Sequence, residues 1–157
     1  MSGEKDESYR RCREAIAALC DGEGDVIARM ASVVAVLHRG MPGFFWTGFY
    51  RVVNGGLVVG PYQGSVGCLR IDFGRGVCGT AAASGETQVV PDVHDFPGHI
   101  ACDPASQSEI VVPVRNENGD LIAVLDVDSD RPGWFDQLDQ KNLGEILDCT
   151  FAGKRIV

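Results

Sequence analysis

Apolar residues recur along the chain with two different spacings, one typical of helices and one typical of strands. A spacing of three and four residues runs through residues 7–19 and 27–38, and this pattern predicts two amphipathic helices near the N-terminus. The same spacing over residues 135–151 predicts an amphipathic helix at the other end of the chain. A short helix is expected at residues 77–84, because its alanines favour a helix and Gly85 can end it.

Residues 44–53 change the period from that of a helix to that of a strand. They are rich in aromatic and β-branched side chains, and an Asn-Gly-Gly turn follows at residues 54–56. They are therefore predicted to form a hairpin with residues 57–62. Alternation along the first strand places Trp46 and Tyr50 on the same face, so one face can belong to the core while the other lines a pocket.

Further strands follow in the second half of the chain. Residues 109–115 and 121–128 are predicted to form a second hairpin across an Asn-Gly turn at residues 118–119. Shorter strands are expected at residues 64–71, which contain Cys68, and at residues 87–90. Hairpins thus dominate the middle of the chain and helices lie at its ends. We expect an α+β fold, with a central, mainly antiparallel sheet flanked on one side by the N- and C-terminal helices.

Length and charge narrow the possible classes of protein. The 157 residues suit one hydrophobic core, so a single domain over residues 1–157 is expected. A formal net charge of -8 with scattered basic residues argues against a nucleic-acid partner. The chain shows neither a secretory signal nor an apolar run long enough to span a membrane. We expect a cytoplasmic protein.

Residues 93–113 interrupt the regular pattern and carry several reactive groups. Pro97, Gly98 and Pro104 break any helical or strand pattern across the segment, which is therefore predicted to be a loop. The loop holds two histidines, several acids and Cys102, and an apolar run follows it directly. Functional groups are often held in this way at the end of a strand. We predict that Cys102 is a nucleophile.

The six cysteines fall into two groups. Three lie on or beside the terminal helices and are expected to be small core residues, namely Cys12, Cys20 and Cys149. The other three lie in turns or loops beside Gly, Asp or His and are candidates for redox or catalytic work, namely Cys68, Cys78 and Cys102. In a reducing compartment a bridge among them is more often transient and redox-active than structural.

Two carboxylates end the last predicted strand. Asp126 and Asp128 lie two residues apart in an otherwise apolar run, so they face the same way. Burying both is costly unless they are paired, hydrogen-bonded or used, which favours a polar pocket. The alternative is that both are solvated beyond the end of the strand. Glu109, alone at the start of its strand, could be a plain surface acid.

Two other kinds of site use the same residues. His94, His99 and Cys102 could join Cys78 or Cys68 in a zinc site, although no close Cys-Cys or His-His pair has the spacing of a zinc finger. A cysteine-protease arrangement of Cys102 with either histidine needs only neighbours in space. The spacing along the sequence neither supports nor excludes it.

Several segments together resemble one known family. The segments are FFWTGFY at 44–50, GRGVCGTAA at 74–82, VVPDVHDFPGHIACD at 89–103, SEIVVPV at 108–114 and GDLIAVLDVDS at 119–129. They are similar to the free methionine-(R)-sulfoxide reductases, which are single-domain enzymes with the GAF fold. The resemblance runs from about Phe44 to the last helix. Cys68, Cys78 and Cys102 fall in their family contexts, a trio that ligand-sensing GAF domains as a class lack.

The resemblance implies a reaction. Free L-methionine-(R)-sulfoxide would be attacked at sulfur by Cys102, while Glu109 and Asp128 share a proton that is given to the departing oxygen. Cys102 would become a sulfenic acid. Cys68 would resolve it as an intramolecular disulfide, with Cys78 as a secondary partner, and thioredoxin would restore the dithiol.

The resemblance also implies how the substrate is held. Asp126 would bind the ammonium group, and backbone N–H groups of the loop at Ile100, Ala101 and Asp103 would bind the carboxylate. Trp46 would form an apolar wall for the methyl group, and Tyr50 would add a hydroxyl beside the oxygen. No organic cofactor or metal is implied, and a homodimer is expected from the family. The alternative function is a non-enzymatic GAF module that senses a small ligand.

Overall fold

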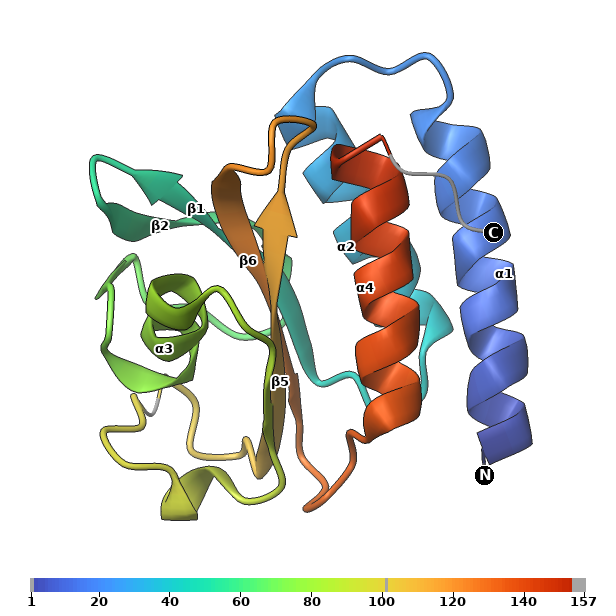
Figure 1. The fold of residues 1–157 in the computed structure, drawn as a ribbon. Helices are drawn as coiled ribbons and strands as arrows, with labels where there is room; N and C mark the ends of the chain where they lie inside the picture. The colour runs from blue at the N-terminus through green and yellow to red at the C-terminus, as the bar shows by residue number, and fades with distance from the viewer. Residues whose placement is uncertain (1, 101, 154–157) are drawn as a thin grey trace.

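The computed structural model describes residues 2–100 and 102–153 and shows an α+β fold built on one sheet (Figure 1). The sheet has six strands in the order β3-β2-β1-β6-β5-β4, and each neighbouring pair is antiparallel. The helices are α1 (Ser2–Cys20), α2 (Val26–Gly40), α3 (Gly76–Ser84) and α4 (Gln137–Phe151), with a 3-10 turn at Val93–Asp95. The strands are β1 (Trp46–Val53), β2 (Gly56–Gln63), β3 (Arg70–Asp72), β4 (Gln88–Val90), β5 (Ser108–Arg115) and β6 (Leu121–Ser129).

Two separate apolar clusters cover the two faces of the sheet. On one face α2 and α4 pack on the strands and α1 lies outside them (Figure 1). Alternate residues of the central strands, such as Phe49 and Leu125, point into this layer. The opposite residues, such as Tyr50 and Val124, form a second cluster with α3. The predicted division of β1 into a core face and a second face is thus confirmed.

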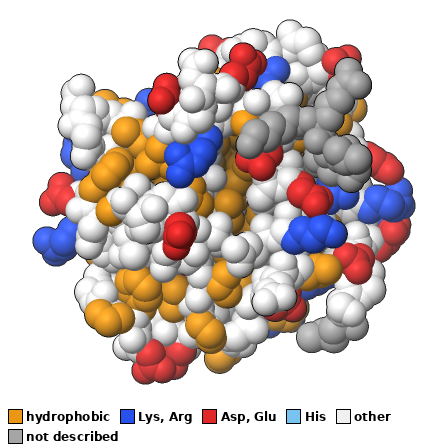
Figure 2. Space-filling view, in the orientation of Figure 1, with side chains coloured by type: hydrophobic (Ala, Val, Ile, Leu, Met, Phe, Trp, Pro, Cys, Tyr) orange, Lys and Arg blue, Asp and Glu red, His pale blue; other side chains and the backbone are white. Residues whose placement is uncertain are grey.

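The predicted α+β fold, an antiparallel sheet with the N- and C-terminal helices on one side, is confirmed. The opposite side of the sheet, for which no helix was expected, is covered as well. The N- and C-terminal helices do share one face, but α3 and the long loops cover the other (Figure 1). The reason is that β5 and β6 are apolar on both faces, with Val111 and Val124 fully buried beneath α3. Such strands need cover on both sides. Figure 2 shows apolar side chains gathered over the α3 half of this view and charged side chains over α1 and α4.

The predicted strand at residues 64–71 is wrong in its extent. Only β3 pairs with β2 there, and Cys68 lies in the loop before it. The glycines explain the difference, because Gly64 adopts a φ of 122°, which other residues rarely reach. The first hairpin is as predicted, with Asn54 and Gly55 at φ 51° and 78°, as a type I′ turn requires.

A buried ion pair joins α1 to α4. Asp139 is fully buried, and it accepts hydrogen bonds from Lys5 Nζ at 2.8 Å and Tyr9 Oη at 2.7 Å. The same carboxylate accepts from the backbone N–H of Asp136 at 2.9 Å in the capping box of α4. One side chain therefore caps a helix and fixes its neighbour. None of the described helices is long and apolar enough to cross a membrane.

Asp139→Ala is expected to lower the free energy of unfolding by about 3 kcal/mol, because it leaves the buried Lys5 ammonium without its partner. Urea denaturation followed by circular dichroism measures the loss. The matched control is Asp148→Ala, an exposed acid on the same helix, which is expected to change stability by less than about 0.5 kcal/mol. Equal losses in the two variants would contradict the structural role of Asp139.

Candidate active site

The register of three strands brings acidic side chains together on the α3 face of the sheet. Asp128 on β6 lies opposite Trp46 on β1 and opposite Glu109 on β5. Directly opposed residues of antiparallel strands point to the same face. Asp126 is two residues away on β6 and shares that face, opposite Gly48 on β1. Three carboxyl groups from two neighbouring strands are thereby placed side by side.

These carboxyl groups line a pocket between the sheet, α3 and two loops. The free space at its centre is about 40 Å³, which is room for roughly three water molecules. The predicted site residues that line it are Trp46, Tyr50, Cys78, Ile100, Cys102, Asp103, Glu109, Asp126 and Asp128. Cys68 adjoins the pocket through its bond to Cys102, and Ala101 lies outside the described residues. The structure therefore brings the predicted set together at one place.

Burial and mutual repulsion keep protons on this acidic cluster. Burial raises the pKa of Glu109 well above its usual range, and the charges of Asp126 and Asp128 raise it further. Burial also raises the pKa of Asp128. For Asp126, burial raises the pKa to about 6, and hydrogen bonds from Glu109 and Cys78 limit the rise. Near neutral pH, Asp126 is therefore the ionised member and Glu109 holds a proton.

One oxygen of Asp126 remains available to a ligand. Asp126 is only 6% exposed, and its Oδ1 is buried with no hydrogen-bond partner in the described part of the chain. A buried carboxylate oxygen without a donor is costly. Asp126 also lines the pocket, so an incoming cationic group can supply the missing donor.

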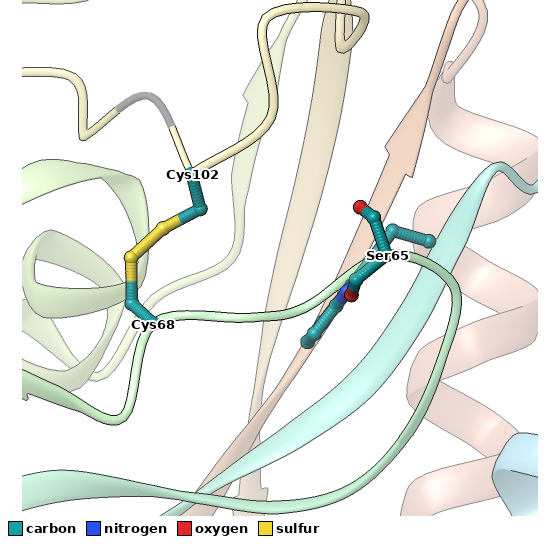
Figure 3. The surroundings of a disulfide bond; sticks show 4 residues. Ser65, Cys68 and Cys102 are labelled. Carbon is teal, nitrogen blue, oxygen red and sulfur yellow. A yellow bond between two sulfur atoms is a disulfide. The ribbon is translucent and has the colours of Figure 1, made fainter.

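The cysteines of the site occupy different environments. Cys68 and Cys102 form a disulfide with Cα atoms 6.0 Å apart, which joins the loop before β3 to the loop before β5 (Figure 3). Cys102 is exposed and Cys68 is partly buried. Cys78 was expected in a turn but lies in the first turn of α3, where burial and nearby carboxylates raise the pKa of its thiol. A protonated, buried thiol is a poor nucleophile.

A hydrogen bond ties the same two loops together near the disulfide. Ser65 Oγ donates to Asp103 Oδ2 at 2.6 Å, and the Ala105 N–H donates to the other carboxylate oxygen at 2.8 Å. These hydrogen bonds lower the pKa of Asp103. Figure 3 shows Ser65 on the same loop as Cys68, across from Cys102. The sequence analysis did not identify Ser65, because a serine in a Gly-rich loop carries no distinctive signal.

An aromatic stack forms the wall of the pocket. The Trp46 ring is stacked with Tyr50 and Tyr62, with centroids 5.9 Å and 5.2 Å away. Trp46 Nε1 donates to the Ser65 carbonyl at 2.8 Å. A Cβ atom at Gly48 would lie 2.6 Å from the Trp46 ring, so glycine is needed for the ring to lie along the strand. Tyr62 was missed by the sequence analysis, although alternation along the second strand of the hairpin could have indicated it.

The alternative zinc site of His94, His99 and Cys102 with Cys78 or Cys68 is not assembled among the described residues. His94 Nδ1 lies 2.8 Å from Asp92 Oδ1 on the surface, and Cys102 is bonded to Cys68. His99 lines the pocket, and burial lowers its pKa. Among residues 2–100 and 102–153, the side chains able to hold a metal ion together are Cys78, Glu109 and Asp126, with ligand atoms within 4.8 Å.

Comparisons with known proteins agree with this geometry. Residues 9–148 match the family model of the GAF domain. The chain is 43% identical to the free methionine-R-sulfoxide reductase of Escherichia coli, over 91% of this chain and 86% of the relative. It is 36% identical to the enzyme of the same name from Saccharomyces cerevisiae, over 90% and 83% of the two chains.

A solved structure gives the same result. The crystal structure of free methionine-R-sulfoxide reductase from Neisseria meningitidis in complex with its substrate superposes with a TM-score of 0.86. It is 45% identical to this chain and covers 90% of it, and this chain covers 85% of that structure. The resemblance seen in the sequence segments is thus confirmed over nearly the whole fold.

The raised pKa of Asp126 predicts a pH-dependent stability. Because folding raises this pKa from 3.8 to about 6, the folded state binds the proton more tightly. The stabilisation is present below about pH 4 and is lost as the pH rises through about 6, at a cost of about 3 kcal/mol by about pH 8. Asp126→Asn removes this contribution, so its unfolding free energy should fall less between about pH 4 and about pH 8 than that of the unsubstituted protein.

Urea denaturation at about pH 4 and at about pH 8 measures the change in unfolding free energy of each protein. Asp130→Asn, at an exposed acid next to the end of β6, is the control and should retain the pH dependence of the unsubstituted protein. An unchanged pH dependence in Asp126→Asn would show that Asp126 is ionised at the same pH in the folded and unfolded chains.

Proposed function

We propose that this chain reduces free L-methionine-(R)-sulfoxide to L-methionine. The premise is that the chain belongs to the GAF domain family and, within it, to the free methionine-R-sulfoxide reductases. The observation that carries the proposal is the disulfide of Cys68 and Cys102 at a pocket whose buried carboxyl groups hold protons. Reduction of a sulfoxide needs two electrons and a proton for the departing oxygen. A dithiol and a neutral carboxyl group supply them.

In the proposed first step the Cys102 thiolate attacks the sulfoxide sulfur. Glu109, kept neutral by burial and by its acidic neighbours, protonates the oxygen as the S–O bond breaks. The oxygen takes a second proton and leaves as water while Cys102 Sγ becomes bonded to the substrate sulfur. A water molecule then adds to Cys102 Sγ as that bond breaks, which releases methionine and one proton and leaves Cys102 as a sulfenic acid. Asp128, opposite Glu109 in the register, shares the proton and returns it to Glu109 between turnovers.

In the proposed second step the Cys68 thiolate attacks the sulfenic acid. The S–S bond forms, and the oxygen leaves as water. The pairing of Cys68 with Cys102 supports this step, because it is the disulfide that the step would form. A dithiol protein such as thioredoxin then reduces the disulfide and is itself oxidised. Cys78 remains a secondary candidate for the resolving role, but its buried, protonated thiol disfavours it.

The same residues account for recognition of a free amino acid. The unpartnered oxygen of Asp126 suits the substrate ammonium group, and loop N–H groups at Ile100, Ala101 and Asp103 would bind its carboxylate. Trp46 offers an apolar wall for the methyl group. Burial raises the pKa of Tyr50, which keeps its hydroxyl protonated and able to donate to the sulfoxide oxygen. No organic or metal cofactor takes part in the proposed reaction.

The disulfide sets the order of events. While Cys102 is bonded to Cys68 it has no free thiolate to attack the sulfoxide sulfur. Reduction of the disulfide therefore precedes each new attack on substrate, and the oxidised and reduced forms of the protein alternate as in a ping-pong mechanism.

Turnover of the two sulfoxide diastereomers tests the proposal. The protein is incubated with dithiothreitol and each form of free methionine sulfoxide, and the methionine formed is quantified. The (R) form should be reduced and the (S) form should not. Cys102→Ser should lower the rate by at least about 10³-fold, because a hydroxyl cannot replace the thiolate as nucleophile. A Cys102→Ser variant with full activity, or an unsubstituted protein that only binds the ligand, would reject the proposal.

Cys68→Ser separates the two proposed steps. This variant should still form one methionine per chain, because the attack by Cys102 is intact, but cycling with thioredoxin should fail without the resolving thiol. A rapid-quench measurement of the first turnover distinguishes the two outcomes. Normal cycling would instead assign the resolving role to Cys78.

A further inference from the structure

Large apolar side chains are exposed at two places on the described surface. One group, Leu19, Val26 and Ile27, lies where α1 meets α2. The other group lies around Cys68 and consists of Val66, Leu69 and Phe73, which are 80%, 72% and 37% exposed. Isolated exposed apolar residues need no explanation, but a group beside a reactive bond is a candidate interaction surface.

The backbone beneath this second group is held in place on both sides. The Ser65 carbonyl accepts from Trp46 Nε1 at 2.8 Å, and the Leu69 carbonyl accepts from the Val59 N–H at 3.0 Å. Ile71 is buried under the sheet edge at 7% exposure. The side chain of Leu69 is therefore exposed, while its backbone is held by a hydrogen bond next to the start of β3. A preformed apolar surface binds a partner at a low entropic cost.

The disulfide beside this surface must be reached from outside in every cycle. Cys102 is exposed and Cys68 is partly buried, so an incoming thiolate can approach along the S–S bond. We propose that Val66, Leu69 and Phe73 form the docking surface for the protein dithiol that reduces the Cys68–Cys102 disulfide. This inference rests on the proposed function, in which the disulfide is the end of each turnover.

The exchange at this surface is balanced in two steps. The partner thiolate attacks Cys102 Sγ, forms a mixed disulfide and releases the Cys68 thiolate. The second thiol of the partner then attacks the mixed disulfide and releases Cys102. The partner leaves as a disulfide, and both cysteines of the chain are reduced with two electrons and two protons taken up.

Charge beside the disulfide is balanced. The chain as a whole carries a net charge of -8. Around the disulfide, the positive charges of Arg70 and Arg75 are matched by the negative charges of Asp72 and of Asp103, which lies next to Cys102. The apolar side chains therefore supply most of the contact with a partner at this place.

Leu69→Asp tests the docking surface, since Leu69 does not line the pocket. Reduction of methionine-(R)-sulfoxide is measured with thioredoxin, thioredoxin reductase and NADPH, and separately with dithiothreitol. We expect kcat/KM for thioredoxin to fall about tenfold, as for the loss of an apolar contact at a protein interface. The dithiothreitol rate should stay within about twofold, because a small thiol needs no docking surface.

The matched control is Leu19→Asp, which places the same charge on the apolar group at the α1–α2 connection. It should leave both rates within about twofold of the unsubstituted protein. Leu69→Ser is a milder change and should lower the thioredoxin rate less than Leu69→Asp. Thermal unfolding of both variants shows whether a lower rate comes from a folding defect.

The outcomes separate this inference from the proposed function. An unsubstituted protein with no dithiothreitol-supported activity rejects the proposed function, and the docking inference with it. Normal thioredoxin kinetics in both Leu69 variants, or an equal loss in Leu19→Asp, overturns the docking surface alone. A change of the Leu69 variants from dimer to monomer without loss of the thioredoxin rate also overturns it, because the apolar group would then contact a second copy of the chain.

Discussion

The site depends on burying three carboxyl groups of two adjacent strands where they cannot all be ionised. The register places Glu109 opposite Asp128 and puts Asp126 on the same face. In a medium less polar than water, neighbouring negative charges repel strongly, so protons remain bound at neutral pH. The neutral Glu109 and the ionised Asp126 follow from this one constraint. In the proposed reaction they serve as the proton donor and as the site for the substrate ammonium group, within one pocket.

The rest of the fold keeps that cluster buried and brings a thiol to it. The terminal helices cover the opposite face of the sheet and form an apolar core with it. The face that carries the acidic cluster therefore does not have to supply that core. On that face α3 supplies small residues and the buried Cys78. Two loops close the remaining side, joined by the Cys68–Cys102 disulfide and by the hydrogen bond from Ser65 to Asp103. The three carboxyl groups thus lie on strands β5 and β6, and the two cysteines of the disulfide lie on loops.

Much of this arrangement could be predicted from the sequence, because hairpin turns and apolar periodicity are local signals. The hairpins, the terminal helices and the face shared by Trp46 and Tyr50 follow from them. A strand was predicted over residues 64–71, but pairing with β2 begins only at Arg70, because Gly64 adopts a φ of 122° that interrupts a strand. The pairing of Cys68 with Cys102 came from the family resemblance, since the 34 residues between them carry no local signal. Contacts made across the fold, such as Ser65 with Asp103, have no signature along the chain.

The account stands on a protonated Glu109 at neutral pH, and infrared spectroscopy of the carboxyl groups observes that proton directly. Spectra of the disulfide form are recorded while the pH is raised from about 5 to about 9, for the unsubstituted protein and for Glu109→Gln. The account predicts a carbonyl stretch of neutral carboxylic acid that persists at neutral pH in the unsubstituted protein and is weaker in Glu109→Gln, where the contribution of Glu109 is lost. Its central claim is contradicted if the unsubstituted protein shows only ionised carboxylates at neutral pH, or if the neutral band is unchanged in the variant.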